Sequence, residues 1–161
     1  MRVFPQSPGP MAHWPRVEAV PGVEHALATL HQRYRLGLLT NAADSGEALV
    51  RAALGRVGLE GHFDLVLTAR ELGCRKPDPA CYRLAARVLG CRPAEVVMVG
   101  DDYDADVAGA RRAGLRAVWY NPTGLVVPAG SEPPDEQVSS LGDLAPAIER
   151  LDKRLVCLGQ W

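Results

Sequence analysis

The chain alternates between short apolar runs and longer segments in which apolar residues recur at helical spacing. Continuous apolar runs are typical of parallel strands that are covered on both faces. Four such runs predict buried strands, at residues 36–40 (LGLLT), 64–68 (DLVLT), 95–99 (EVVMV) and 115–120 (LRAVWY).

The segments between these runs are predicted to be helices. Ser45 is the expected N-cap of the second helix, Pro79 suits the first turn of the third, and Gly90 suits its end. The helices are expected at residues 23–34, 45–57, 79–89, 104–113 and 142–152.

Strands that alternate with helices predict an α/β fold, a three-layer doubly wound, Rossmann-like parallel sheet. The length of 161 residues favours a single domain over residues 1–161. Residues 1–20 are rich in proline and are expected to be irregular, apart from a very short strand at Arg2–Phe4. A Pro/Gly-rich loop is expected at 121–136.

Composition narrows the function classes. Hydrophobic residues make up 47% of the chain, and the formal net charge is −1, which argues against a broad nucleic-acid-binding or anionic-membrane surface. No apolar run approaches the roughly 18 residues of a membrane span. The N-terminus lacks an export-like apolar region, so we expect a cytoplasmic protein. The four cysteines form no C-x-x-C pair, which predicts free thiols and no zinc site.

Polar residues follow three of the predicted strands. Thr40 and Asn41 end one strand, Arg75–Lys76 lies a few residues past another, and Asp101 and Asp102 end a third. In parallel sheets the ligand crevice lies beyond the carboxyl ends of the strands. A hydroxyl, an amide, an ammonium and several carboxylates are therefore expected at one sheet edge, as in a site for a phosphate with Mg²⁺.

Each of these residue types has a chemical reason to be in such a site. Mg²⁺ prefers oxygen ligands, so Asp101 is a candidate direct ligand, and Asp106 could bind the metal or a metal-bound water. Lys76 would offset the charge of a phosphoryl group, and the Thr40 hydroxyl would donate to phosphate oxygens. Simpler roles stay open: Thr40–Asn41 as a turn, Lys76 in a solvated segment before a helix, and Asp102 and Asp104 as helix caps, with Asp104 assigned to capping.

Three motifs together resemble the haloacid dehalogenase-like hydrolase superfamily, phosphatase type. LGLLTNA resembles its second motif, CRKPDPACY its third, and EVVMVGDDYDADVAGARRAG its fourth, and the likeness spans roughly residues 17–151. The resemblance implies a Mg²⁺-dependent phosphomonoesterase of small organic phosphates that works through an aspartyl-phosphate. It also implies a role for each site residue: Thr40 and Lys76 catalytic and phosphate-binding, Asn41 phosphate-binding, and Asp101, Asp102 and Asp106 at the metal.

The family's first motif, a strand followed by D-x-D-x-[TV], is absent, and so is the helical cap that normally follows it. No Asp or Glu precedes Glu18. Two explanations stay open: a truncated form, or a degraded first motif at residues 3–9 (VFPQSPG). Either way the nucleophile is missing, so the sequence predicts a weak or inactive hydrolase. The alternatives are a non-catalytic binding module or a split enzyme completed by another chain.

The missing motif normally supplies a central strand. We expect Arg2–Phe4 to run parallel between strands 36–40 and 96–99 in its place. Two alternatives stay open: a strand lent by a second copy of the chain, and direct pairing of those two strands. The expected partner is a small phosphorylated molecule, and a homodimer or a complementing chain stays open.

Overall fold

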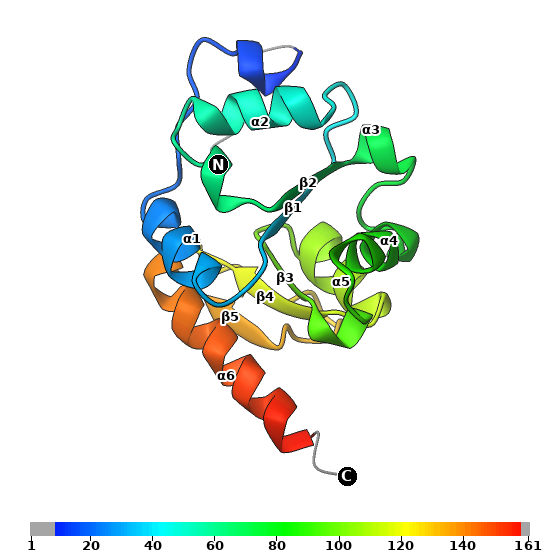
Figure 1. The fold of residues 1–161 in the computed structure, drawn as a ribbon. Coiled ribbons are helices and arrows are strands. Elements are labelled where there is room, and N and C mark those ends of the chain that lie inside the picture. Colours follow the sequence, from blue (N-terminus) through cyan, green and yellow to red (C-terminus); the bar gives the residue numbers. More distant parts are fainter. Residues whose placement is uncertain (1–8, 159–161) are drawn as a thin grey trace. The chain divides into compact units, whose positions relative to one another are not determined.

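The computed structural model describes residues 9–158 (Figure 1), with side chains described for residues 9–152. The chain divides into two compact units, with the boundary between Arg75 and Lys76. In both units parallel strands are combined with helices, which confirms the α/β class. The single domain over residues 1–161 stays a prediction.

The first unit is built around two parallel strands, β1 (Gly37–Thr40) and β2 (Leu65–Thr68). Their register pairs Gly37 with Leu65 and Thr40 with Thr68, so both strands end level with each other. Three helices belong to this unit: α1 (Val23–His31), α2 (Glu47–Gly55) and α3 (Ala69–Leu72). Two short 3-10 turns, Met11–His13 and Glu60–His62, complete it.

The core of the first unit is apolar and joins α2 to β2. The buried residues are Val50 and Leu54 on α2, Leu59 after it, and Val66 on β2. Val23 and Leu27 of α1 pack against this group, as their helical spacing predicts. The helices expected at 23–34 and 45–57 and the strands expected at 36–40 and 64–68 are confirmed to within a few residues.

The N-cap predicted for α2 is wrong. Gly46 occupies the N-cap position and makes no side-chain cap, while the Ser45 hydroxyl donates to the Asp44 carboxylate at 2.8 Å. Glu71 provides the cap instead, because its Oε1 accepts from the Glu47 backbone N–H at 2.9 Å. Glu71 lies in α3, a short helix that the sequence does not predict. The Thr68 hydroxyl caps this helix by accepting from the Glu71 N–H.

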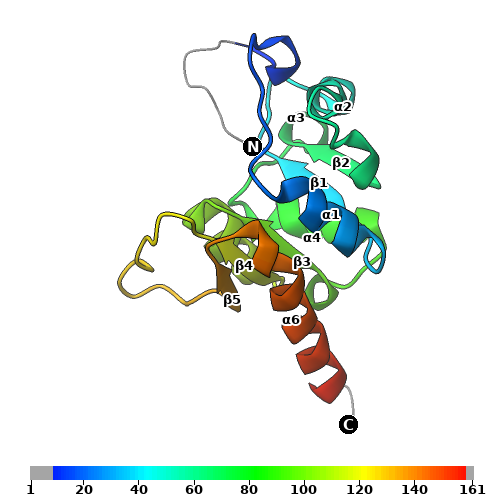
Figure 2. The same cartoon turned by 90° about the vertical axis from the view of Figure 1, so that its left-hand side faces the viewer.

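The second unit contains a three-stranded parallel sheet in the order β3–β4–β5. The strands are β3 (Val97–Gly100), β4 (Arg116–Tyr120) and β5 (Glu136–Val138). The helices are α4 (Pro79–Leu89), α5 (Gly109–Arg112) and α6 (Leu144–Leu158). Figures 1 and 2 show α4 and α5 on one side of these strands and α6 on the other, so the sheet is covered on both faces.

Helix α4 has the ends that its sequence predicts. The Asp78 carboxylate accepts from the Ala80 N–H at 2.8 Å and Pro79 begins the helix. Gly90 ends it with a φ of +73°, in the left-handed region that glycine adopts without strain. This helix places Tyr82 in the interior, where it is fully buried.

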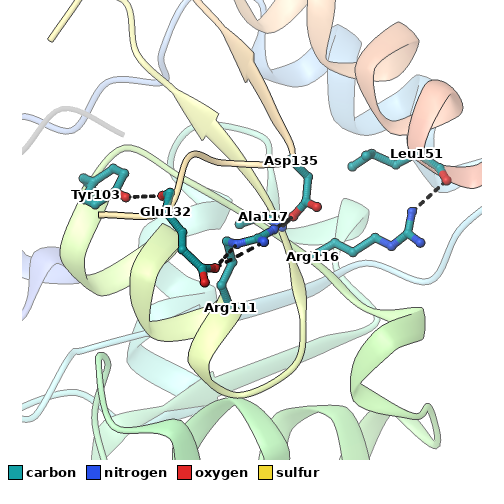
Figure 3. A network of polar contacts seen from close by, with 7 residues as sticks. All are labelled: Tyr103, Arg111, Arg116, Ala117, Glu132, Asp135 and Leu151. Atoms are coloured by element: carbon teal, nitrogen blue, oxygen red, sulfur yellow. Dashed lines mark hydrogen bonds and ion pairs between the residues drawn. The ribbon is translucent and has the colours of Figure 1, made fainter. Parts of the chain in front are cut away.

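A polar network fixes the segment that returns from β4 to β5 (Figure 3). Arg111 lies 2.6 Å from the Asp135 carboxylate, which also accepts from the Ala117 N–H at 2.8 Å. Arg111 contacts Glu132 at 3.3 Å, and the Tyr103 hydroxyl donates to the Glu132 carbonyl. These bonds tie the last part of the Pro/Gly-rich loop to the second unit. Strand β5, which the sequence does not predict, begins at Glu136, the last residue of the expected loop.

The strand predicted at Arg2–Phe4 lies outside the described residues. Within residues 9–158, β1 pairs with β2, and β3 pairs with β4, in two separate ladders. The pairing of 36–40 with 96–99 is therefore absent from the ladders of residues 9–158. In the same part of the chain, the helices are too short or too polar to cross a membrane.

Candidate functional site

The candidate site of the second unit begins where β3 ends. Asp101 directly follows Gly100, the last residue of the strand, and its side chain is exposed. The Trp119 indole N–H on the neighbouring strand donates to the Asp101 carbonyl oxygen at 3.0 Å. The backbone that carries the Asp101 carboxylate is therefore held by a buried side chain of β4.

A π-helical turn, Tyr103–Ala108, follows this strand end and leads into α5. Its N-cap is Asp102, whose Oδ1 accepts from the Ala105 N–H at 2.9 Å. The assignment of capping to Asp104 is therefore wrong, because the neighbouring carboxylate caps the turn. Such wide turns are frequent at functional sites, since they change the direction in which side chains project.

Asp106 and Lys76 form a buried ion pair. The Lys76 Nζ lies 2.6 Å from Asp106 Oδ1, and the two side chains are only 12% and 7% exposed. The other carboxylate oxygen, Oδ2, accepts from the Asp102 N–H at 3.1 Å. The structure thus brings together two predicted site residues that are 30 positions apart in the sequence.

Gly100 is required by the position of Asp106. A Cβ atom at residue 100 would clash with the Asp106 carboxylate, which packs directly over the end of the strand. We expect Gly100→Ala to destabilise the chain by about 1–3 kcal/mol, the usual cost of overpacking. Urea denaturation measures this cost, and Gly61→Ala is the control because a Cβ there meets no atom within 4 Å. Equal stability of the two variants would contradict the close packing.

Tyr82 supports the same turn from α4, a role that its place in the CRKPDPACY motif does not predict. Its hydroxyl donates to the Ala105 carbonyl in the middle of the π-helical turn, and a Cβ at Gly109 would clash with that hydroxyl. Burial and the nearby Asp106 carboxylate raise the pKa of the Tyr82 hydroxyl, so it stays a neutral donor at ordinary pH.

Thr40 and Asn41 lie in the first unit, at the end of β1. The Thr40 hydroxyl oxygen accepts from the Ala42 N–H at 3.3 Å, a turn-like contact that leaves the hydroxyl proton able to donate to a ligand. Asn41 follows in the loop and is half-buried. Both residues line a cavity of about 290 Å³ together with side chains of α2.

The donor set of the second unit fits a metal bound through one protein carboxylate. The Asp101 carboxylate has no hydrogen bond or ion pair to residues 9–152, whereas Asp106 accepts from Lys76 and from Asp102 N–H, and Asp102 caps the turn. Among the described residues, no three Asp, Glu, His or Cys side chains gather into a group that could hold a metal alone. Mg²⁺ suits this arrangement, because it keeps several waters beside one or two carboxylates.

Comparison with known sequences identifies the family. The haloacid dehalogenase-like hydrolase family matches residues 14–114. A phosphoserine phosphatase of Thermus thermophilus is 41% identical over 133 residues, which cover 80% of this chain and 49% of that protein. A human N-acylneuraminate-9-phosphatase is 33% identical, with 81% of this chain and 52% of that protein covered. The chain thus spans about half the length of these curated relatives.

Solved structures give the same result. A 2-haloacid dehalogenase from Pseudomonas syringae pv. Tomato superposes with a TM-score of 0.70 at 35% identity, over 81% of this chain and 53% of that one. A protein of Listeria monocytogenes superposes with a TM-score of 0.79 at 25% identity, over 89% of this chain and 86% of that one. With this family match over more than half of its residues, the chain belongs to the haloacid dehalogenase-like hydrolases.

Proposed function

We propose that this chain carries the metal- and phosphate-binding residues of a Mg²⁺-dependent phosphomonoesterase of small organic phosphates. The observation that carries the proposal is the buried Lys76–Asp106 pair at the carboxyl end of a parallel strand. Asp106 packs against Gly100 and accepts from the Asp102 N–H, the two residues on either side of the exposed Asp101. The names of two related proteins, a phosphoserine phosphatase and an N-acylneuraminate-9-phosphatase, support this reaction class.

Each residue has a role that follows from its chemistry. Lys76 provides a positive charge for a phosphoryl group, and Asp106 holds the Lys76 ammonium in one position. Thr40 and Asn41 donate hydrogen bonds to phosphate oxygens. Asp101 would hold the metal. Asp102 caps the turn that follows Asp101, and Asp106 accepts from the Asp102 N–H, so both support the backbone next to Asp101. When bound, Mg²⁺ would neutralise charge on the phosphate ester.

The carboxylate nucleophile is the part that these 161 residues do not supply in the family's usual position. The first acidic residue is Glu18, and the segment before it contains no D-x-D motif. A phosphate ester positioned by Lys76 and the metal would therefore lack the D-x-D carboxylate that the family resemblance assigns as the nucleophile. We infer that the chain by itself is impaired as a hydrolase, and that a complete active site needs a D-x-D segment from further polypeptide.

This proposal predicts that the purified chain does not hydrolyse p-nitrophenyl phosphate above background in the presence of millimolar Mg²⁺. The assay measures release of p-nitrophenolate, with Asp101→Asn measured in parallel. We expect the two rates to be equal, since neither chain has a nucleophile to activate. Mg²⁺-dependent turnover that is lost in Asp101→Asn would overturn the inference that the chain is impaired.

A non-catalytic binding module is the alternative that these residues also fit. Such a module would bind phosphate esters and Mg²⁺ at the same groups and would stay inactive whatever segment is added. Fusing an N-terminal strand that carries D-x-D-x-T to the chain distinguishes the hydrolase from the binding module. Turnover gained by the fusion supports the hydrolase, provided that it disappears when the first aspartate is changed to asparagine. A folded fusion that binds phosphate without turnover supports the module.

A further inference from the structure

The first unit contains a cavity whose lining comes mostly from residues outside the predicted phosphate site. Its volume is about 290 Å³, and Thr40 and Asn41 form only one part of its lining. The greater part is apolar and comes from the N-terminal segment, β1 and α2: Met11, Trp14, Leu38, Leu49, Val50 and Ala53.

The wall formed by the N-terminal segment is held in place by specific bonds. Figure 1 shows the Met11–His13 turn beside α2. Arg56, at the end of α2, donates to the carbonyl oxygens of Trp14 at 2.5 Å and Ala12 at 3.1 Å. The Trp14 indole N–H donates to the Gly9 carbonyl at 2.8 Å, which fixes the ring beside the cavity.

The polar part of the lining carries groups suited to an anion. The Thr40 hydroxyl accepts from the Ala42 N–H, so its own proton can be donated to a ligand. Arg70 lies against the same loop, with its guanidinium donating to the Asp44 carbonyl at 3.4 Å and its N–H to the Ala42 carbonyl at 3.3 Å. The Asp44 carboxylate also lines the cavity and opposes an anion, although it accepts from the Ser45 hydroxyl.

We propose that this cavity takes the organic group of the phosphate ester, and that this group is apolar and about the size of one aromatic ring. The inference rests on the proposed function, because it uses Thr40 as the phosphate contact. A cavity of roughly 150 Å³ is enough to hold benzene, so the space here accommodates a ring with a short linker. The polar residues Thr40, Asn41, Asp44 and Ser45 form only part of the lining. A sugar or amino-acid group would also place hydroxyl or charged groups against Trp14, Met11 and Leu49, and burying a polar group against apolar side chains costs free energy.

Two phosphonates with the same charged head group test whether the cavity takes an apolar ring. Isothermal titration calorimetry compares phenylphosphonate with methylphosphonate, with inorganic phosphate as the reference for the head group alone. Burial of the ring is expected to make phenylphosphonate bind about tenfold or more tightly than methylphosphonate. Phenylphosphonate should also change the fluorescence of Trp14, and this change should be absent in Trp14→Phe.

Adjacent alanines of α2 provide a matched pair of variants. Ala53 lines the cavity and is 1% exposed, whereas Ala52 is exposed. Ala53→Leu should abolish the preference for phenylphosphonate and keep the affinity for methylphosphonate, while Ala52→Leu should change neither. Met11 also lines the cavity but belongs to the N-terminal segment, not to α2. Met11→Trp should therefore have the same effect as Ala53→Leu, which keeps the test valid if Ala53→Leu unfolds.

The outcomes distinguish failure of the apolar cavity site from failure of the phosphate site. Equal affinities for the two phosphonates, or a preference that survives in folded Ala53→Leu or Met11→Trp, overturn the cavity inference and leave the proposed function standing. Failure of all three anions to bind contradicts the phosphate site, and therefore the proposed function with the inference that rests on it.

Discussion

Replacing Asp106 with alanine is expected to destabilise the chain by about 3–5 kcal/mol, the usual cost of removing one partner of a buried ion pair. The change takes the carboxylate away from the Lys76 ammonium, which is only 12% exposed. It also removes the acceptor of the Asp102 N–H at the start of the π-helical turn. Urea denaturation followed by circular dichroism measures the free energy of unfolding.

Asp104 provides the control for this experiment. It lies two residues away and is exposed, so Asp104→Ala should change stability by no more than about 0.5 kcal/mol. The double variant Lys76→Met/Asp106→Leu should recover part of the loss, because apolar replacement of both partners avoids an uncompensated buried charge. A small effect of Asp106→Ala, similar to that of Asp104→Ala, would show that the pair does not hold the turn.

Trp119→Ala is expected to cost about 3–5 kcal/mol, as large-to-small changes at buried aromatic residues do. Trp119 is 1% exposed and packs edge-to-face on Tyr103, with 5.2 Å between ring centroids. Its indole N–H also donates to the Asp101 carbonyl, so the loss combines packing with the support of the candidate metal ligand. Thermal and urea denaturation both measure the effect.

Trp119→Phe separates these two contributions. The phenyl ring keeps much of the packing but lacks the indole N–H, so we expect a smaller loss of stability and weaker Mg²⁺ binding through Asp101. Val126→Ala is the control, because Val126 is 87% exposed and should tolerate the change. Unchanged Mg²⁺ affinity in folded Trp119→Phe would mean that the indole hydrogen bond does not position Asp101.

The elements with strong local signals were predictable from the sequence. The apolar run 36–40 forms β1 at Gly37–Thr40, and Asp78-Pro79 with Gly90 delimits α4 as expected. Strand β5 was missed because Glu136–Val138 has neither an apolar run nor a clear alternation. It forms because Val118, Trp119 and Tyr120 of β4 provide a ladder for it.

Features that depend on tertiary contacts were less predictable. Ser45 precedes α2 in a sequence suited to capping, but Glu71, which is 24 residues from Glu47, provides the capping acceptor. Sequence spacing does not show that a carboxylate from another helix lies nearby. The helical pattern after Asp102 likewise did not distinguish an α-helix from the π-helical turn.

For the candidate site, the sequence indicated the residue types but not their pairing. Lys76 was expected at the phosphate and Asp106 at the metal, and the structure shows them bonded to each other. The contribution of Trp119 was missed, because a tryptophan at the end of an apolar strand is typical of core packing. Its role depends on the strand register, which pairs Trp119 with Gly100, the residue before Asp101, and the sequence does not show this register.

We expect Mg²⁺ to bind this chain through Asp101. The most direct test is the melting temperature as a function of Mg²⁺ concentration, measured for the natural chain, Asp101→Asn and Asp104→Asn. A ligand that binds only the folded state raises stability by about 1.4 kcal/mol at ten times its Kd. We predict a rise of a few degrees in the natural chain and in Asp104→Asn, and its loss in Asp101→Asn. An equal rise in all three proteins would place the ion elsewhere and contradict the claim.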